Sequence, residues 1–264
     1  MKSHVVKQSR FFDRLNEIEL YLIYFLQRVF MAEKLEKIHN YVADMLSTRY
    51  LSYSPLFLYS LGQIEEAKKL ARSLIFYSFF SSIVKFTIPR LRPFKYPNVY
   101  TKETFDSSSF PSRHTIASIV ISSAIPWIPI RITVILVMVL NRMIMGCHFL
   151  TDTLAGAFFG ALSVYLGHYF TDMNFFVLVL IVSIYLWQNC ARVIGGVLPI
   201  LLASDYKCNP YVVLISVAKI PLAKIFLNFF NATTRYDILV SELFHTTLVT
   251  FVVTKISKAL DLLK

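Results

Sequence analysis

Three ionisable side chains stand close together in the segment N-R-M-I-M-G-C-H-F-L-T-D, residues 141–152, which lies between two apolar runs. Arg142, His148 and Asp152 sit at the edge of hydrocarbon, where an ionisable group is costly and needs a reason to be present. His148 and Asp152 are four residues apart and share one face if the segment is helical. The carboxylate can then hold one ring nitrogen and leave the other to act as a nucleophile. The alternative is a helix start at a membrane surface where the two residues only pair with each other.

A second group of charged residues lies in K-F-T-I-P-R-L-R-P, residues 85–93. Lys85 and Arg92 are seven residues apart, close to two helical turns, so on a helix they point the same way. Such a pair suits phosphate, because Arg supplies a planar fork of donors and Lys a compact charge. The alternative is a basic helix end whose side chains reach lipid headgroups. That alternative explains Arg90 and Lys95 well, whereas Lys85 lies deeper and favours a functional role.

A third group, F-P-S-R-H-T, occupies residues 110–115 just before a long apolar run. Pro111 followed by Ser112 predicts a helix start with Ser112 as its cap. The free N–H groups of such a start, with the positive end of the helix dipole, form an anion site. Arg113 and His114 add a cation and a proton donor at the same place. The alternative is a capped helix with an incidental histidine, which explains Ser112 but leaves Arg113 and His114 unexplained.

Together the three groups contain the parts of a phosphoryl-transfer site. A reacting phosphate requires a nucleophile, a proton donor for the leaving oxygen and cations for the other oxygens. No carboxylate cluster suited to Mg²⁺ accompanies them in the sequence, so we expect a reaction without a metal or another cofactor, through a phosphohistidine that water hydrolyses. The expected roles are nucleophile for His148 with Asp152 behind it, proton donor for His114, and phosphate-binding cations for Lys85, Arg92 and Arg142.

The order and spacing of these residues resemble the three-part signature of the type 2 phosphatidic acid phosphatase superfamily. The matching motifs are Lys85-x6-Arg92-Pro93, Pro111-Ser112-x-His114 and Arg142-x5-His148-x3-Asp152. That superfamily includes integral-membrane lipid phosphate phosphatases and soluble vanadium haloperoxidases. The resemblance covers residues 40–170 and implies an all-helical core of six spans with its site at the luminal or outer face. It also implies His148 as nucleophile, Asp152 as its partner, His114 as general acid, and phosphate binding by Lys85, Arg92, Ser112, Arg113 (through its backbone) and Arg142.

Two positions depart from the signature and bear on the substrate. Asn141 replaces the usual Ser and can still form a hydrogen bond. Arg113 replaces the usual Gly, as other residues do in branches that resemble this sequence and act on sphingoid-base phosphates or dolichyl diphosphate. The R-L-R-P segment is similar to broad-specificity lipid phosphate phosphatases. The short loop 92–111, the motif G-C-H-F-L-T-D-T-L-A-G and the C-terminal spans resemble sphingosine-1-phosphate phosphatases more. We therefore expect a long-chain-base 1-phosphate, with phosphatidate or an isoprenoid diphosphate as alternatives.

The composition indicates a polytopic membrane protein. Of 264 residues, 56% are hydrophobic and the mean hydropathy is +0.56, which is too apolar for a soluble domain. The net charge of +11 is spread between apolar runs, so the lipid bilayer and a phosphorylated lipid are better partners than nucleic acid. Three cysteines without metal-ligand spacing predict no disulfide framework. The N-terminal residues lack the pattern of a cleavable signal peptide.

The apolar runs predict six spans, which fit the six-helix phosphatase core that the resemblance implies, and two or three extra C-terminal spans. They also predict an N-terminal interfacial helix at 18–30, with a short span there as the alternative. We expect an amphipathic segment at residues 1–38, a catalytic core at 39–170 and C-terminal transmembrane helices at 171–264. A charged loop is predicted at 65–72. The predicted core spans are 41–62, 73–85, 115–130, 132–140, 153–171 and 173–191, since roughly 20 apolar residues cross a bilayer. Pro126 and Pro129 would end the third of these spans, and Gly146 is well placed to end the helix of the fourth.

The distribution of positive charge predicts the orientation. Basic residues at 68–72, Arg131, Lys207 and the C-terminal tail would lie opposite the three groups, and the positive-inside rule makes that side cytoplasmic. We therefore expect a luminal site, in the endoplasmic reticulum if the substrate is a sphingolipid.

Other classes of protein compete with this interpretation. A transporter would distribute polar residues along several spans, whereas here they collect at one end. A catalytically silent scaffold or lipid binder would not need intact His114, His148 and Asp152. A soluble haloperoxidase would not need the uncharged runs at 153–171 and 173–191.

Overall fold

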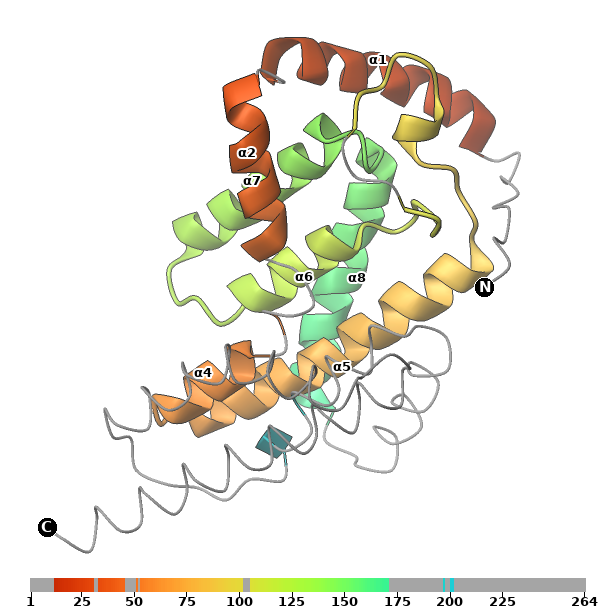
Figure 1. The fold of residues 1–264 in the computed structure, drawn as a ribbon. Helices are drawn as coiled ribbons and strands as arrows, with labels where there is room; N and C mark the ends of the chain where they lie inside the picture. Colours follow the sequence, from red (N-terminus) through yellow and green to blue (C-terminus); the bar gives the residue numbers. More distant parts are fainter. Residues whose placement is uncertain are drawn as a thin grey trace, which may run out of the picture. The chain divides into compact units, whose positions relative to one another are not determined.

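A computed structural model describes residues 12–30, 33–45, 51, 53–101, 105–170, 197 and 200–201. These described residues form helices and no β-strand, so the all-α expectation is confirmed for them. The elements, labelled as in Figure 1, are α1 (Asp13–Phe30), α2 (Glu33–Met45), α4 (Ser54–Ser60), α5 (Ile64–Thr87), the short 3-10 helix η2 (Pro93–Lys95), α6 (Arg113–Ser122), α7 (Ile128–Ile144) and α8 (Leu150–Tyr169).

The chain divides into two compact units, each built from segments that are distant in sequence. The first unit comprises Met1–Ser47 and Phe80–Leu162, and the second comprises Thr48–Phe79 and Ser163–Lys264. Helices α5 and α8 contribute residues to both units. All three groups of polar residues belong to the first unit.

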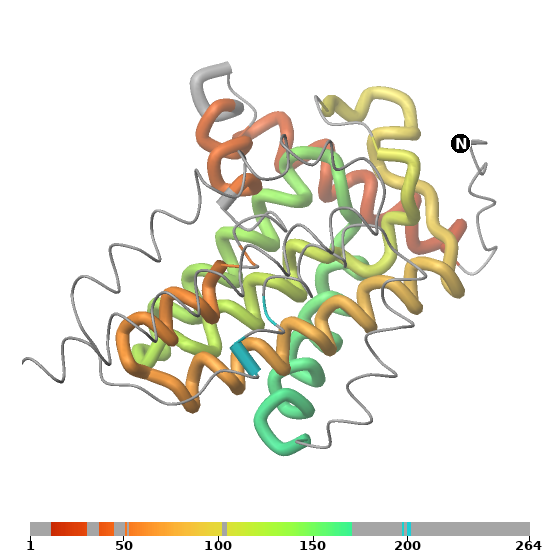
Figure 2. Tube along the Cα trace, turned by 60° about the horizontal axis from the view of Figure 1, so that its bottom comes forward, coloured from red at the N-terminus to blue at the C-terminus, as the bar shows by residue number. Residues whose placement is uncertain are grey.

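Helix α7 is the centre of the packing in the first unit. Helices α1, α2 and α6 contact it, and α6 and α7 run side by side in Figures 1 and 2. Helix α8 packs closely on α6 through two glycines. A Cβ on Gly156 would lie 2.7 Å from the Ser112 carbonyl oxygen, and one on Gly160 would lie 2.9 Å from Ile119 Cβ. Small residues at these contacts let the two helices approach, as is common between membrane helices.

Helix α1 differs from an ordinary amphipathic helix, because its buried face carries polar as well as apolar residues. The buried residues are Asn16, Glu19, Leu20, Ile23, Leu26 and Gln27. Its exposed face carries an apolar stripe of Ile18, Tyr21, Phe25 and Val29, which are 52–76% exposed. The side of α1 that faces the protein thus supplies charge, and the side that faces outward is suited to lipid.

The second unit contains α4, the first part of α5 and the end of α8. A small core joins Leu56 and Tyr59 of α4 with Ala67 of α5. Arg72 on α5 donates from Nε to the Gly167 carbonyl on α8 over 2.7 Å. This hydrogen bond satisfies a carbonyl in the last turn of α8, which has no partner within the helix.

Two predictions for the first part of the chain were wrong. The predicted span at 41–62 is not one helix, because Tyr53 lies in a turn between α2 and α4. The charged segment 65–72, expected to be a loop, is the start of α5, where Lys69 Nζ lies 2.7 Å from Glu66 Oε1. Ion pairs between residues three apart on a helix stabilise it, which explains how so charged a segment is helical.

The predicted span at 115–130 was also wrong. Helix α6 ends at Ser122 and α7 begins at Ile128, with Pro129 in its first turn. Proline is favourable there because the first helical N–H groups have no partner within the helix. The proline therefore starts α7 instead of ending α6, and α6, with 10 residues, is shorter than the roughly 20 that cross a bilayer.

Among the described residues, α8 alone is both long and apolar enough to span a membrane. It has 20 residues and closely matches the predicted span at 153–171. The polytopic architecture stays a prediction. The predicted span at 173–191 and the extra C-terminal spans lie outside the described residues, and the domain boundaries at 38 and 170 are not tested.

Candidate active site

The first polar group lies where α5 ends and the chain becomes extended. Lys85 is in the last turn of α5, and Arg92 follows beyond the helix with φ −84° and ψ 153°. The two residues are therefore not on one helix, contrary to the expectation of two helical turns. They meet instead at the carbonyl of Ser108, to which Lys85 Nζ donates over 2.5 Å and Arg92 Nη2 over 3.4 Å. The loop before α6 thus gathers both cations.

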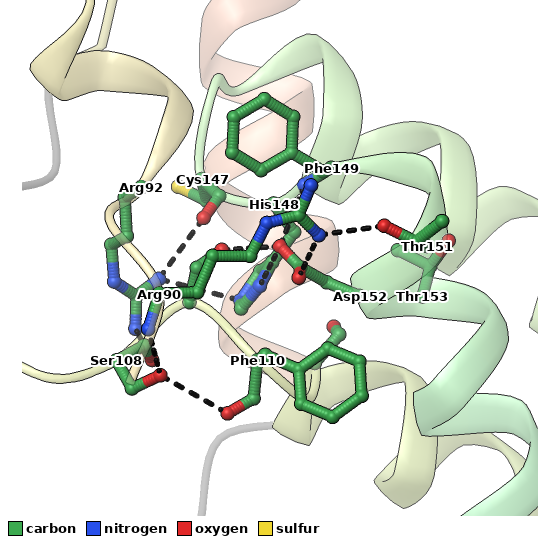
Figure 3. Close-up of polar contacts among 12 residues, drawn as sticks. Arg90, Arg92, Ser108, Phe110, Cys147, His148, Phe149, Thr151, Asp152 and Thr153 are labelled. Atoms are coloured by element: carbon green, nitrogen blue, oxygen red, sulfur yellow. Dashed lines mark hydrogen bonds and ion pairs between the residues drawn. The ribbon is translucent and has the colours of Figure 1, made fainter. Parts of the chain in front are cut away.

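Arg92 is 4% exposed and its guanidinium is held in one orientation by surrounding oxygens. Nε donates to the Ser107 carbonyl, Nη2 to Ser107 Oγ and Nη1 to the Cys147 carbonyl, over 3.0, 3.0 and 3.1 Å. Nη1 also lies 3.3 Å from His148 Nε2 (Figure 3). Arg92 therefore links the first polar group directly to the third.

Helix α6 begins at the remaining polar group, and the prediction that Ser112 caps it is confirmed. Ser112 Oγ accepts from the Thr115 N–H over 3.4 Å and from the Thr115 hydroxyl over 3.0 Å. The backbone N–H of Ser112 donates to the Asp152 carbonyl over 2.9 Å. The starts of α6 and α8 are therefore fixed against each other.

A tight turn between α7 and α8 carries His148. Gly146 has φ +63°, which confirms the prediction that it ends α7. A Cβ at this position would lie 2.7 Å from the Tyr100 carbonyl oxygen, so both backbone conformation and space require glycine. The His148 N–H then donates to the Arg142 carbonyl over 3.3 Å, which folds the turn back onto the end of α7.

The side chains of His148 and Asp152 face each other, but not as neighbours on one helix. His148 precedes α8, and its Nδ1 lies 3.6 Å from Asp152 Oδ2. Oδ2 also accepts from the Phe149 N–H over 2.8 Å and from the Ser109 hydroxyl, while Oδ1 accepts from Arg90 Nη1 over 2.6 Å. Both side chains are buried. Nδ1 therefore faces the carboxylate, and Nε2 lies on the side of the cations.

Burial and the surrounding cations keep the imidazole of His148 neutral. Burial lowers the pKa of His148 well below its ordinary value, and the charges of Arg92, Lys85, Arg142 and Arg113 lower it further. Burial also lowers the pKa of Arg92, to about 10, so the guanidinium stays charged at neutral pH. A neutral imidazole beside charged guanidinium groups is suited to nucleophilic attack on an anion bound there.

The other expected site residues surround this pair. Arg113 and His114 are the first two residues of α6 and are half-buried, and Arg142 is buried in the last turn of α7. Burial lowers the pKa of His114 well below its ordinary value, and the charge of Arg142 lowers it further. Asn141, in place of the usual Ser, donates from Nδ2 to the His39 carbonyl over 2.9 Å. The three groups meet at one site, and the individual roles stay predictions.

Arg90 does not reach lipid headgroups, contrary to the sequence interpretation. It is fully buried, and Nη1 donates over 2.6 Å both to Asp152 Oδ1 and to Thr151 Oγ1 (Figure 3). Nη2 donates to Glu19 Oε2 on α1, also over 2.6 Å. Neither Arg90 nor Glu19 was predicted to belong to the site. The one signal in the sequence was a carboxylate, Glu19, among the apolar clusters of the predicted interfacial helix.

Comparison with known proteins supports the resemblance. The family model of the PAP2 superfamily matches residues 66–176, a segment that contains every motif residue from Lys85 to Asp152. No curated protein and no solved structure matches the chain. The family match and the assembled motif residues together support a phosphatase of the PAP2 superfamily, with its domain at residues 66–176.

Proposed function

We propose that this protein is a membrane-embedded lipid phosphate phosphohydrolase that needs no metal and acts through a phosphohistidine on His148. The placement of the His148 ring carries the proposal. Nδ1 faces the Asp152 carboxylate at 3.6 Å, and Nε2 lies 3.3 Å from Nη1 of Arg92. A nucleophilic nitrogen thus stands where cations can hold the phosphate that it attacks.

In the first half-reaction, the Nε2 lone pair of His148 attacks phosphorus, and the bond between phosphorus and the lipid oxygen breaks. The electron pair leaves with the lipid oxygen, which takes a proton from His114 and departs as the alcohol. The imidazole becomes positively charged as the nitrogen–phosphorus bond forms. The Asp152 carboxylate stabilises that charge through the proton on Nδ1.

In the second half-reaction, His114 takes a proton from water while the water oxygen attacks phosphorus. The nitrogen–phosphorus bond breaks, its electron pair returns to Nε2 of His148, and inorganic phosphate leaves. His114 must be protonated in the first step, although burial and nearby cations lower its pKa in the free site. A bound phosphate dianion offsets those cations and favours the protonated form, so His114 gains its proton when substrate binds.

Four cations would hold the phosphate oxygens. Arg92 supplies a planar fork, and Lys85, which donates to the same Ser108 carbonyl, supplies a compact charge. The start of α6 adds Arg113 together with the N–H groups that Ser112 leaves open to an anion. A cation at a helix N-terminus opposes the helix dipole, and an anion bound there removes this penalty. Arg142 completes the set from the end of α7.

The proposed substrate is a long-chain sphingoid-base 1-phosphate. The similarity of the third motif, G-C-H-F-L-T-D-T-L-A-G, to sphingosine-1-phosphate phosphatases supports this choice, as does a residue other than Gly at position 113. Phosphatidate and isoprenoid diphosphates are the alternatives, because the same cations would bind any terminal phosphate.

We also propose that the protein is a multi-pass protein of the endoplasmic reticulum with its site on the luminal face. Apolar stripes on the helices support membrane embedding. Ile132, Leu136 and Leu140 on α7 are 47–55% exposed, and Leu154 and Phe158 on α8 are 59% and 64% exposed. Side chains spaced four apart form a continuous apolar surface suited to hydrocarbon.

The test is phosphate release from sphingosine 1-phosphate, phosphatidate and farnesyl diphosphate by the full chain in membranes, with EDTA present. Release that survives EDTA and is lost in His148→Ala would support the mechanism, and the ranking of the three lipids would identify the substrate branch. His168→Ala is the matched control, because His168 lies at the far end of α8 in the second unit. No release from any lipid by the folded protein would refute the proposal.

A further inference from the structure

Helix α1 brings a carboxylate to the start of the helix that carries Asp152. Glu19 is buried, and its Oε1 accepts the backbone N–H of Thr151 over 2.6 Å while Oε2 accepts the Thr151 hydroxyl over 2.9 Å. Thr151 is in the first turn of α8, where N–H groups have no partner within the helix. Glu19 therefore caps α8 from 132 residues earlier in the chain.

Arg90 joins this carboxylate to Asp152 and has no donor left for a substrate. A guanidinium has five N–H donors. The structure gives Arg90 five hydrogen bonds: Nε to Asn16 Oδ1 (3.0 Å), Nη2 to Asn16 Oδ1 and Glu19 Oε2 (2.6 Å each), and Nη1 to Thr151 Oγ1 and Asp152 Oδ1 (2.6 Å each).

Aromatic rings close both faces of the same guanidinium. Cζ of Arg90 lies 4.4 Å from the ring centre of Phe12 and 4.0 Å from that of Phe149. Such cation–π contacts are strongest when the cation is shielded from water, and Arg90 is 0% exposed. Arg92 also has its donors occupied, but its partners are neutral groups that a phosphate can displace. Arg90 instead binds two carboxylates and is enclosed by two rings, so its effect on the reaction must pass through Asp152.

We propose that Glu19 and Arg90 are positioning residues, through which α1 holds Asp152 in place against His148. The proposal rests on the proposed function, in which His148 is the nucleophile. Arg90 binds Oδ1 of Asp152 and so leaves Oδ2 turned toward His148 Nδ1. Glu19 fixes Arg90 from the other side and balances its charge. Without Glu19, Asp152 is the one carboxylate left among the hydrogen-bond partners of Arg90. The guanidinium also loses its hydrogen bond to Glu19 Oε2.

Two variants test the link directly. Glu19→Gln keeps an oxygen for Thr151 but removes the charge opposite Arg90, and Arg90→Lys keeps the charge but lacks the planar fork. We expect kcat to fall about tenfold or more in each, because small displacements at a reacting centre are costly. KM should change little, since neither side chain touches the phosphate.

Two further variants on α1 separate positioning from a general loosening of the helix. Glu17→Gln is the same substitution at an exposed position. Gln27→Ala removes the hydrogen bonds from Nε2 to the carbonyls of Tyr100 and Ile144, 2.8 Å each, and leaves the buried ion pairs intact. We expect Glu17→Gln to behave as wild type and Gln27→Ala to lose stability while it keeps kcat.

The ring of His148 gives a readout that does not depend on turnover. ¹⁵N NMR of histidine-labelled protein reports its tautomer and titration midpoint, and His148→Ala identifies the signal. The charged and titratable groups around this ring are Lys85, Arg92, Arg113, His114, Arg142 and Asp152. In Glu19→Gln the preference for the proton on Nδ1 should weaken, and the midpoint should move to lower pH because a negative charge is lost. Gln27→Ala should keep both.

The outcomes distinguish this inference from the proposed function. If the wild-type protein hydrolyses no phosphorylated lipid, the proposed function fails, and the NMR comparison still decides the positioning role. Identical kcat and NMR behaviour of Glu19→Gln and Glu17→Gln would overturn the inference. So would a Gln27→Ala variant that reproduces every change. If Glu19→Gln does not fold, Glu19→Asp replaces it and is compared with Arg90→Lys. Its shorter side chain keeps the charge but places the carboxylate farther from Thr151.

Discussion

Replacement of Asp152 by asparagine tests the proposed mechanism most directly. In the first half-reaction the ring of His148 acquires a positive charge, and the Asp152 carboxylate is the anion nearest to it. Asp152→Asn keeps the shape of the side chain and removes that charge. We expect a large fall in kcat with a small change in KM, because Asp152 acts on the nucleophile and not on the phosphate.

The separation of the two groups sets the size of this effect. At 3.6 Å, opposite unit charges interact by about 4 to 5 kcal/mol at an effective dielectric constant of about 20. Each 1.4 kcal/mol is about a factor of ten in rate, so kcat should fall roughly a thousandfold. The amide must also place a donor against either Arg90 Nη1 or the Phe149 N–H. A lost hydrogen bond to a charged group lowers the free energy of unfolding by about 1.5–3 kcal/mol.

The assay is phosphate release in EDTA, with folding checked by thermal unfolding in the same detergent. Ser109→Ala is the control, because it removes one hydrogen bond to Asp152 and leaves its charge in place. It should lower kcat by at most about a hundredfold, less than Asp152→Asn, since a hydrogen bond to a charged group contributes about 1.5–3 kcal/mol and the carboxylate charge remains. A fall of less than tenfold in a folded Asp152→Asn variant would show that the carboxylate does not stabilise the reacting imidazole, and would refute the mechanism.

Three further results are expected. Because burial and cations lower the pKa of His148, its ¹⁵N signal should report a neutral ring at pH 6.5, and a half-protonated ring there would contradict this electrostatic account. In His114→Ala, p-nitrophenyl phosphate should still phosphorylate His148, because its leaving group needs no proton. Radiolabelled phosphohistidine should then accumulate, because no base remains to activate water. A variant that never becomes labelled would argue against this role of His114. Gly146→Ala should lower the free energy of unfolding by about 1–2 kcal/mol and reduce activity, because its φ of +63° disfavours a Cβ. An unchanged unfolding midpoint would contradict the requirement for glycine.

Some features of this protein followed from local rules of the sequence. Ser112 after Pro111 predicted the start of α6, Gly146 predicted the end of α7, and an uncharged run predicted α8. These predictions succeeded because capping, left-handed backbone and hydrophobic length depend on a few neighbouring residues. The break between α6 and α7 was missed because Pro129, at the edge of an apolar run, can end one helix or start the next.

The types and spacing of the motif residues were enough by themselves to propose the chemistry. A histidine, its carboxylate and a set of cations suggest phosphoryl transfer wherever they meet, and the short motifs carried all of them. Only the tertiary structure decided how they meet. Lys85 and Arg92 do not share a helix, yet both donate to the Ser108 carbonyl. Arg90 points into the protein and donates to Asp152.

The contribution of α1 was beyond the reach of the sequence for a physical reason. Glu19 on a predicted interfacial helix satisfies every local rule with its side chain in water, and nothing nearby in the chain shows that it is buried. Its partners, Arg90 and Thr151, lie 71 and 132 residues away. A buried charge is tolerated only where an opposite charge and hydrogen bonds meet it, and that compensation exists only once the helices have packed.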